Sequence, residues 1–339
     1  MIERNDYSLL KHNSFGIDVK AKHFIEYKDE DELLLFLQQG KLKKPFLHIG
    51  EGSNLLFLHD YEGMILHSAI RGVEIIEESK DQIIVQVGAG ENWDEFVAHC
   101  VENEWYGAEN LSLIPGEVGA AAVQNIGAYG VELKDLVHSI ETIDTEGNFT
   151  VYTASACEYA YRHSVFKKPE NKNLFITRVN LCLSKNKNFY LDYGSIRKEL
   201  DKDKDITLKK VRDVIIKIRE EKLPNPDDIG NGGSFFMNPV IAPDFFNKLQ
   251  NEYPDIPFYK LPNDTYKIPA AWMIDQCGWK GKKVGNVGVY PKQALVLVNY
   301  GGATGKEVFL LAKSIQDSVN HKFGIKLRPE VNYIGSYTK

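Results

Sequence analysis

The strongest constraint on this chain is one run, residues 113–130, that is rich in glycine and alanine and contains no basic residue. Glycine admits positive φ angles and lets the backbone approach a ligand closely. Successive N–H groups in such a loop can hold a phosphate without a lysine, and residues 119–123 can begin a helix whose positive end faces the same anion. The side-chain amides of Gln124 and Asn125 can bind the edge of a heterocycle. These residues indicate a pyrophosphate-bearing cofactor; the alternative is a packing turn between a strand and a helix.

A shorter glycine loop lies nearer the N-terminus and follows the apolar run at residues 46–49; it is the first glycine loop of the chain, and the run at residues 113–130 is the second. The first loop contains Gly50 and Gly52 and ends with the polar pair Ser53 and Asn54. Neither loop has the glycine spacing of the dinucleotide-binding fingerprint, and the lysine-bearing P-loop pattern is absent from the sequence. Two glycine loops that lie far apart in the sequence indicate a cofactor clamped between two subdomains.

The size and composition of the chain set its broad class. A chain of 339 residues is too long for one ordinary core, so we expect two or three domains. The hydrophobic content of 43% and the charged content of 26% are typical of a soluble globular protein. No apolar run approaches the ~18–20 residues of a membrane span, and the polar start is unlike a signal peptide. We therefore expect a cytoplasmic protein with no membrane partner.

The charge and the cysteines exclude further classes. A net charge of −6 argues against nucleic-acid binding, so an anionic substrate must be held by a local cluster. The four cysteines are scattered without a CxxC spacing, so we expect buried thiols, no disulfide and no metal site.

Hydrophobic periodicity predicts a mixture of helices and strands. Helices are predicted for residues 29–39, from an Asn92 cap through residue 101, for 207–221, for 269–277, and from a Thr304–Glu307 capping box to Gly324. Strands are predicted at 46–49, 63–67, 72–76, 82–87, 139–144, 149–153, 175–183, 295–299 and 325–333. Because helices and strands do not alternate regularly, a doubly wound parallel sheet is not supported.

Together with a third stretch, GGSFFMNP at residues 232–239, the two glycine loops resemble the UDP-N-acetylenolpyruvoylglucosamine reductases. These are flavoenzymes that make UDP-N-acetylmuramate for bacterial peptidoglycan. The resemblance rests on IPG…QNIGAYG, YRHSVFK, GSFFMNP and PEV, and it runs from about Asn13 to Gly335. It implies an α+β fold: a two-subdomain FAD-binding domain of the vanillyl-alcohol oxidase (PCMH) type, residues 1–60 and 61–200, followed by an α+β substrate-binding domain, residues 201–339.

The resemblance also implies the ligands. FAD and NADPH are the expected cofactors, the substrate is a small-molecule nucleotide sugar, and the protein is expected to be a monomer. The residues implied for cofactor binding are Gly50, Glu51, Gly52, Ser53, Asn54, Ile114, Pro115, Gly116, Gly119, Gln124, Asn125, Ile126, Gly127, Ala128 and Tyr129. Glu117 departs from what a phosphate loop requires, because its charge repels phosphate, so its side chain must point away or the placement of the loop is wrong.

Three residues are implied to be catalytic. Arg162 matches the residue that holds and polarises the enolpyruvyl carboxylate, since its planar fork suits a carboxylate; by itself it reads as a surface arginine stacked on Tyr161. Ser234 matches the proton donor; by itself it reads as a turn serine. Glu330 matches the third catalytic group; by itself it reads as a salt-bridge partner of Arg328. A bare carboxylate repels an enolate, so Glu330 is expected to be protonated or to act through water or Arg162.

Further substrate contacts follow from the resemblance. The implied residues are Tyr161, Tyr193, Lys222, Asn238, Lys267 and Gln293. Each can also be an ordinary surface side chain. Tyr193 and the insertion at residues 189–205 favour the longer subtype, in which a tyrosine loop covers the substrate diphosphate.

Two other functions remain open at this point. One is an FAD-dependent oxidase of an alcohol or sugar, which fold alone does not separate from a reductase. The other is a nucleotide-sugar sensor without catalysis, against which Arg162, Ser234 and Glu330 speak.

Overall fold

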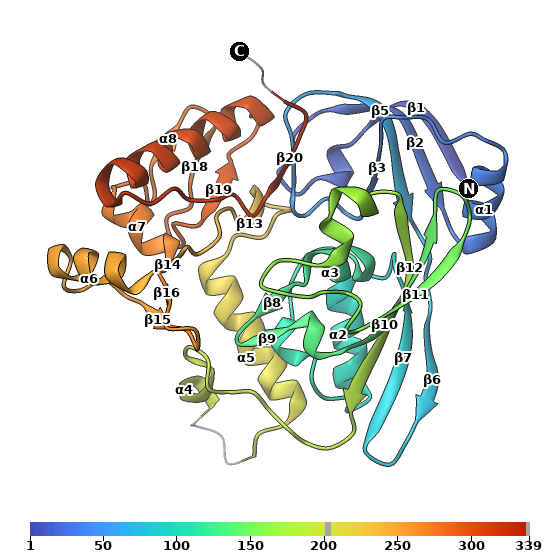
Figure 1. Ribbon diagram of the computed structural model, residues 1–339, viewed down its shortest axis with the longest axis horizontal. Coiled ribbons are helices and arrows are strands. Elements are labelled where there is room, and N and C mark those ends of the chain that lie inside the picture. Colours follow the sequence, from blue (N-terminus) through green and yellow to red (C-terminus); the bar gives the residue numbers. More distant parts are fainter. Residues whose placement is uncertain (201–204, 337–339) are drawn as a thin grey trace. The chain divides into compact units, whose positions relative to one another are not determined.

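The computed structural model describes residues 1–200 and 205–336, which pack into two compact units (Figure 1). Unit 1 consists of Met1–Tyr7, Ala21–Glu51 and Glu62–Glu220, and unit 2 of Ser8–Lys20, Gly52–Tyr61 and Glu221–Lys339. The division at residues 60 and 200 expected from the sequence stays a proposal, and residues 201–204 at its second boundary lie outside the described part.

The first sheet of unit 1 has the strand order β1-β2-β5-β3. Its strands are β1 (Ile2–Ser8), β2 (Lys20–Tyr27), β5 (Tyr61–Ser68) and β3 (Phe46–Ile49). Helix α1 (Glu30–Gln38) begins at Asp29, whose side chain accepts a hydrogen bond from the backbone N–H of Glu32. Leu33 and Phe36 of α1 are buried against the sheet residues Ile25 and Leu66. The predictions for 29–39, 46–49 and 63–67 are confirmed.

The second sheet of unit 1 has five antiparallel strands in the order β11-β10-β12-β7-β6. The strands are β6 (Val73–Glu78), β7 (Gln82–Gly88), β10 (Val137–Asp144), β11 (Phe149–Thr153) and β12 (Leu174–Ser184). Gly147, with φ +86°, turns the chain from β10 to β11. All strands predicted here are confirmed, and the antiparallel pairing agrees with the absence of a regular βαβα pattern.

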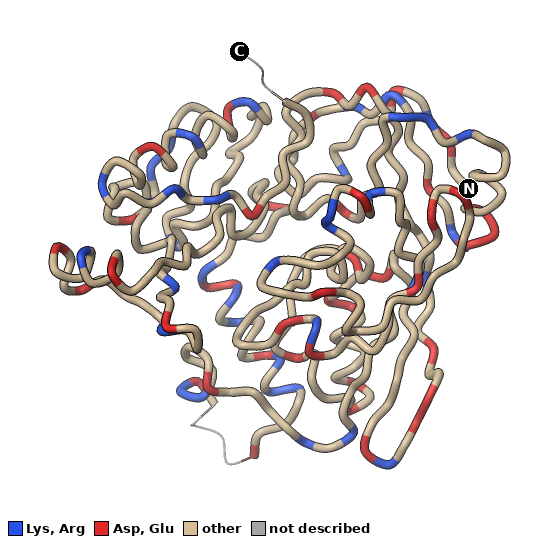
Figure 2. Tube along the Cα trace, viewed as in Figure 1, with Lys and Arg blue, Asp and Glu red and all other residues tan. Residues whose placement is uncertain are grey.

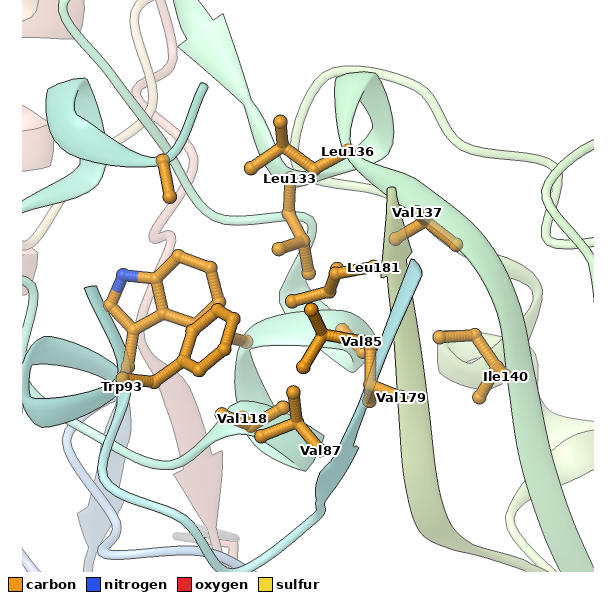
Figure 3. Packing of buried hydrophobic residues seen from close by; sticks show 14 of the residues in the cluster. Val85, Val87, Trp93, Val118, Leu133, Leu136, Val137, Ile140, Val179 and Leu181 are labelled. Carbon is orange, nitrogen blue, oxygen red and sulfur yellow. The ribbon is translucent and has the colours of Figure 1, made fainter. Parts of the chain in front are cut away.

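Helices cover this sheet and build the largest core of unit 1. Helix α2 (Trp93–Glu102) is capped by Asn92, whose side chain accepts from two backbone N–H groups, and α3 (Val118–Gln124) contributes Val118. Figure 3 shows side chains from α2, α3, β7 and β12 gathered in one cluster. Trp93 is fully buried, and its Nε1 donates to the carbonyl of Leu111 at 2.9 Å.

The remaining elements of unit 1 are short, apart from one helix. They are η2 (Glu109–Leu111), β8 (Gly127–Ala128), β9 (Val131–Glu132), η3 (Leu133–Asp135), η4 (Val165–Lys167), η5 (Pro169–Asn171), α4 (Ile196–Leu200) and α5 (Leu208–Lys222), whose last two residues belong to unit 2. Helix α5 confirms the prediction for 207–221 and packs Val211, Ile215 and Ile218 against Leu191 and Ile196.

Unit 2 is built around a four-stranded sheet in the order β13-β19-β18-β17. Its strands are β13 (Gly230–Ser234), β17 (Lys283–Val284), β18 (Val287–Val289) and β19 (Val296–Asn299). The helices of the unit are η1 (Leu10–His12), α6 (Pro243–Glu252), α7 (Ala270–Gln276) and α8 (Gly305–Phe323). Thr304 and Glu307 form the predicted capping box of α8, and Gly324 ends it in the left-handed conformation, as predicted.

Two small sheets complete unit 2. One has the order β14-β16-β15, from β14 (Val240–Ile241), β15 (Tyr259–Lys260) and β16 (Tyr266–Lys267). In the other, β20 (Asn332–Ile334) pairs in parallel with β4 (Leu55–Phe57). The predicted strand at 325–333 is therefore mostly wrong: before β20 this segment has only an isolated bridge between Pro329 and Phe236 among the described strand pairs. Proline has no backbone N–H to donate to a ladder.

The cysteine prediction is partly confirmed. Cys100 and Cys157 are buried and all four cysteines are unpaired thiols, but Cys182 and Cys277 are partly exposed. Among the described residues, no group of histidine, cysteine or acidic side chains has the arrangement of a metal site. In the same part of the chain, no helix has the length and apolar content needed to cross a membrane.

The core of unit 1 gives a first testable prediction. Replacement of Trp93 by alanine leaves a large cavity and an unpaired carbonyl at Leu111, so the free energy of unfolding should fall by about 3–5 kcal/mol. Chemical denaturation followed by circular dichroism measures this loss. Leu35→Ala is the matched control, because this side chain of α1 is 55% exposed and its loss should change stability little. Equal stability of the two variants would contradict the assignment of Trp93 to the core.

Candidate functional site

The first glycine loop begins directly after β3. A Cβ atom at Gly50 would lie 2.9 Å from Oε2 of Glu117 and 3.1 Å from Cβ of Ala120, so only glycine fits without movement. Gly50 and Glu51 belong to unit 1, and Gly52, Ser53 and Asn54 belong to unit 2. Asn92 donates to Oε1 of Glu51 at 3.2 Å.

The second glycine loop has a strained backbone on both sides of α3. Leu113, Asn125 and Tyr129 have φ values of +58°, +48° and +49°. Residues other than glycine rarely adopt this region, and such conformations gather at functional sites. This strain is therefore independent support for a binding role of the segment.

Helix α3 is tied to the start of α2. The backbone N–H of Val118 donates to the carbonyl of Glu91 at 2.9 Å, and that of Gly119 to the carbonyl of Ala89 at 2.8 Å. A Cβ atom at Gly119 would lie 2.8 Å from Cβ of Ala89. Close packing alone explains why residue 119 is a glycine. Its role in cofactor binding stays a proposal, and contacts to a phosphate would have to come from other backbone amides of the loop.

The side chain of Glu117 is turned into the protein. Its carboxylate is 4% exposed and lies 2.9 Å from Nε2 of His67. Glu117 is the N-cap residue of α3, but its side chain makes no capping bond. A buried carboxylate that faces an imidazole does not contribute a bare negative charge to the surface of the loop, so Glu117 does not contradict phosphate binding there.

The two amide side chains at the end of α3 differ. Asn125 is fully buried, donates to Glu132 and to the carbonyl of Ala160 at 2.9 Å each, and accepts from the N–H of Lys134 at 3.0 Å. Its side chain is thus used within the protein. Gln124 accepts from Lys167 at 2.9 Å, but its buried Nε2 has no hydrogen-bond partner among the described residues.

Residues 159–167 are fixed against the end of α3. Tyr159 donates to the carbonyl of Ala122 at 3.1 Å, and Ser164 to that of Val123 at 2.6 Å. The last carbonyls of a helix lack partners within it; Tyr159, just before the YRHSVFK segment, and Ser164 within it supply two of these partners. Sequence positions almost forty residues apart are brought together in this way.

Arg162 lies at the tip of a turn in this segment. The turn is closed by reciprocal backbone bonds between Ala160 and His163, and Arg162 has φ +55°. Its Nη2 donates to the carbonyl of Gly127 at 3.2 Å, and Nη1 lies 3.5 Å from the carbonyl of Asn125. The predicted catalytic arginine and the second glycine loop therefore form one local cluster.

The tyrosine loop, residues 189–195, packs on the end of the second glycine loop. Asn110 donates to the carbonyls of Tyr129 and Tyr190 at 3.0 and 2.8 Å, and the rings of Tyr129 and Tyr193 meet edge to face at 6.2 Å. A Cβ atom at Gly130 would lie 2.4 Å from the ring of Tyr190. Tyr193 is 43% exposed, as suits a residue that meets a ligand.

Arg219 on α5 is a candidate that the sequence did not reveal. Figure 2 shows basic residues along α5, but only burial distinguishes one from another. Burial lowers the pKa of Arg219, as does the charge of Arg162, while Tyr129 and Asp94 oppose the shift. Its buried Nε has no hydrogen-bond partner among the described residues, so this cation beside the cluster suits an anionic or carbonyl group of a ligand.

In unit 2, Ser234 and Glu330 lie on neighbouring segments. The N–H of Glu330 donates to the carbonyl of Phe235 at 2.8 Å, and that of Met237 to the carbonyl of Arg328 at 2.9 Å. Ser234 ends β13 after Gly233, whose φ of +64° marks an irregularity in the pairing with β19. Buried Phe235 fixes the chain directly after the hydroxyl.

The first glycine loop reaches this pair of segments. The side-chain amide of Asn54 donates to the carbonyl of Glu330 at 3.2 Å, and the N–H of Asn332 donates to the carbonyl of Asn54 at 3.0 Å. Unit 2 therefore brings together part of a predicted cofactor loop and two predicted catalytic residues.

The other predicted substrate residues are less concentrated. In unit 2, Asn238 accepts from the N–H of Ala270 at 2.9 Å, the ammonium group of Lys267 lies 5.6 Å from the centre of the Tyr259 ring, and Gln293 accepts from the N–H of Leu295 at 3.3 Å. Lys222 is exposed at the end of α5. In unit 1, Tyr161 is 39% exposed beside Arg162. Their substrate roles stay proposals.

The polar atoms of unit 1 fit a flavin nucleotide. Buried polar groups normally have partners, yet Asn110 Oδ1, Gln124 Nε2 and Arg219 Nε have none among the described residues. Asn110 bonds Tyr129, Gln124 belongs to α3, and Arg219 interacts electrostatically with Tyr129. A ligand that offers acceptors to Gln124 Nε2 and Arg219 Nε, and a donor to Asn110 Oδ1, would complete these groups.

Fold and site together define the class, an FAD-binding protein with an additional α+β domain. Residues 21–152 match the family model described as FAD binding domain, and residues 225–334 match the one described as UDP-N-acetylenolpyruvoylglucosamine reductase, C-terminal domain. The chain belongs to the UDP-N-acetylenolpyruvoylglucosamine reductase family, as the sequence predicts.

Individual relatives extend over nearly the full chain. A UDP-N-acetylenolpyruvoylglucosamine reductase of Bacteroides fragilis (strain YCH46) is 59% identical, covering 97% of this chain and 99% of the relative. Reductases of the same name from Porphyromonas gingivalis (strain ATCC 33277) and Pseudomonas aeruginosa (strain PAO1) are 48% and 44% identical, covering 98% and 96% of this chain and 99% and 97% of the relatives. A crystal structure of the reductase from Thermus caldophilus matches with a TM-score of 0.69 at 21% identity, covering 98% of each chain. This likeness confirms the predicted fold class.

The contact between Gly130 and the tyrosine loop gives a second prediction. In Gly130→Ala the new methyl group meets the ring of Tyr190, so residues 189–195 should become more sensitive to limited proteolysis. Gly40→Ala is the matched control: Gly40 also has a positive φ, of +64°, but nothing lies within 4 Å of its Cβ position. Both variants bear the backbone strain of alanine at positive φ. Equal proteolysis of the two would contradict the packing role of Gly130.

Proposed function

We propose that this chain is an FAD- and NADPH-dependent enzyme that reduces UDP-N-acetylglucosamine enolpyruvate to UDP-N-acetylmuramate in peptidoglycan precursor synthesis. The proposal is supported by relatives of this name over the full chain and by a match to an FAD-binding family model. We further propose that it acts as a monomer in the cytoplasm.

One structural observation supports the chemistry most directly. The N–H of Glu330 donates to the carbonyl of Phe235, so the segments that carry the Glu330 carboxyl group and the Ser234 hydroxyl are adjacent. The side chain of Asn54, in the first glycine loop, donates to the carbonyl of Glu330. The proposed proton donor, the proposed acid and part of the proposed cofactor loop therefore lie on hydrogen-bonded segments of unit 2.

Residues of both glycine loops would hold the cofactor. The proposed set includes Gly50–Asn54 and the backbone of residues 114–129, with Gln124 and Arg219 as the partly unsatisfied donors. When bound, FAD that has been reduced by NADPH supplies a hydride.

Arg162 would orient and polarise the carboxylate of the enolpyruvyl group. Its guanidinium is held by the carbonyls of Gly127 and Asn125, which leaves its planar fork in a fixed position. A fixed positive charge stabilises the negative charge that develops on the carboxylate during reduction.

Ser234 would donate a proton to the carbon that becomes basic beside that carboxylate. A serine hydroxyl is a weak acid, so it serves only a strongly basic centre such as an enolate. The proposed part of Glu330 is to support this transfer in a protonated form or through a water molecule, since a bare carboxylate would repel the enolate.

The visible spectrum of the purified protein tests the cofactor and the reaction together. We expect a yellow protein that bleaches with NADPH under anaerobic conditions and recovers its colour when the enolpyruvyl sugar nucleotide is added. A colourless protein would contradict the proposal and favour a sensor. Rapid oxygen consumption with an alcohol, without recovery by the sugar nucleotide, would favour an oxidase.

The role of Ser234 gives a third prediction. Ser234→Ala should leave the reduction of the flavin by NADPH nearly unchanged, because that step needs no proton from Ser234. Reduction of the substrate should slow by at least the ~10²–10⁴ that a lost general acid costs. Stopped-flow absorbance separates the two half-reactions. Ser314→Ala on α8 removes an exposed hydroxyl that donates to the carbonyl of Leu310 at 2.9 Å, and it is the control for loss of a hydroxyl elsewhere. Equal losses in both half-reactions would refute the assigned role.

A further inference from the structure

Three titratable side chains of unit 1 contact one another and have no part in the proposed reaction: Glu26, His67 and Glu117. The Nδ1 atom of His67 lies 3.0 Å from Oε2 of Glu26, and its Nε2 lies 2.9 Å from Oε1 of Glu117. His67 and Glu117 are 7% and 4% exposed, so these interactions are largely withdrawn from water. We call this group the histidine cluster.

The hydrogen bonds of the histidine cluster require an extra proton. An ionised carboxylate only accepts hydrogen bonds, and a neutral imidazole donates through one of its two nitrogens. Because both ring nitrogens of His67 face carboxylate oxygens, both bonds form only when the imidazole carries two protons or one carboxyl group is protonated. Burial opposes the charge of His67, but Glu117 and Glu26 outweigh it and raise its pKa above the ordinary 6.5.

The histidine cluster lies where both glycine loops begin. His67 on β5 is the register partner of Ile49, the last residue of β3, and Gly50 follows directly. Oε2 of Glu117 lies 2.9 Å from the position of a Cβ atom at Gly50. Because Glu117 is also the N-cap residue of α3, its backbone starts the helix of one loop while its side chain contacts the other loop.

Other titratable groups face the histidine cluster from the neighbouring elements. Burial, together with the charge of the cluster's imidazole, lowers the pKa of His48 to about 3, so His48 is neutral and bonds Tyr27 at 2.8 Å. Burial also raises the pKa of Tyr27, which therefore keeps its proton. Burial raises the pKa of the Glu117 carboxyl group, on which the charges of Glu51 and Arg71 act with opposite signs.

We propose that the histidine cluster fastens the start of the first glycine loop to α3 through one shared buried proton, so that His67 and Glu117 are positioning residues for FAD binding. The inference rests on the proposed use of FAD. Removal of His67 leaves Glu117 as a buried charge without its counter-charge, which is strongly unfavourable. Removal of the Glu117 charge leaves the His67 ring with Glu26 alone. The two segments then lose the interaction that fixes their separation.

The shared proton sets the direction of the pH dependence. A group whose pKa is raised in the folded protein contributes stability below its ordinary pKa and loses this contribution as the pH rises through the raised value. The pKa values of His67 and Glu117 are both raised, so both weaken the cluster on the alkaline side. FAD affinity should therefore fall as the pH rises through the pKa of His67, above 6.5.

The test measures release and rebinding of FAD by the full chain, through the fluorescence of the free flavin, between about pH 6 and about pH 9. His67→Gln and Glu117→Gln should each raise the Kd at the acidic end by at least about tenfold, as expected for a broken buried charge pair, and should flatten the pH profile. Glu141→Gln is the matched control and should retain the wild-type Kd. Its carboxylate lies on β10 and accepts from Gln86 and Asn180 at 2.8 and 3.0 Å.

Each outcome decides the matter. A wild-type Kd and an unchanged pH profile in both variants would overturn the inference and leave the proposed function standing. If His67→Gln does not fold, Glu117→Gln decides, together with the ¹⁵N shifts of the His67 ring and the ¹³C shifts of the Glu26 and Glu117 carboxyl groups. Near neutral pH the extra proton is expected on the ring or on one carboxyl group, and a singly protonated ring between two ionised carboxylates overturns the proposal. A wild-type protein that binds no FAD would overturn the proposed function and this inference with it.

Discussion

The candidate site of unit 1 depends on the hydrogen bonds made by the buried side chain of Asn125. It joins the end of α3 to Glu132, to the N–H of Lys134 and to the carbonyl of Ala160. The backbone of Asn125 is left-handed, and short amide side chains tolerate that conformation better than most because they bond locally. Since Ala160 closes the turn that carries Arg162, one amide fixes both the glycine loop and the arginine beside it.

This arrangement shows that the two glycine loops need different kinds of support. The segment at residues 113–130 is held by hydrogen bonds with η3 and with the turn at 160–163. Asn110 binds the carbonyl of Tyr129 in this segment and also that of Tyr190 in the tyrosine loop. The segment at 50–54 is short and leaves one unit to enter the other. Its beginning is defined by the close approach of Glu117 to Gly50, and its end by the bonds of Asn54 to the C-terminal segment.

Local signals in the sequence identified most of the long elements. Asn92 and Thr304 are recognisable N-cap residues of α2 and α8, and the apolar residues of α2, α5 and α8 recur at helical spacing. These helices could therefore be placed without knowing what they pack against. β1 was missed because it is a polar edge strand with most side chains exposed. The segment at 325–333 was misjudged because its partners, Phe235 and Asn54, are far away in sequence.

The site followed the same division. Motif resemblance predicts catalytic roles for Arg162, Ser234 and Glu330, which stay predictions, whereas Arg219 and His67 carry no local signal. Their importance comes from burial and from partners such as Tyr129 and Glu117 that only the folded chain brings near. Charge arguments from the sequence left two alternatives, that Glu117 turns away from the loop surface or that the loop is placed wrongly. They did not identify His67, which faces the buried carboxylate.

The pairing of β4 with β20 has a consequence for synthesis on the ribosome. Asn54 must wait for Glu330, 276 residues later, which is roughly 14 to 55 s at typical elongation rates. Until then Leu56 and Phe57, which are fully buried in the finished protein, have no strand to cover their edge. During synthesis the chain therefore exposes an apolar segment at β4 that is prone to association. A holdase chaperone that binds such segments would bind here until β20 has been synthesised.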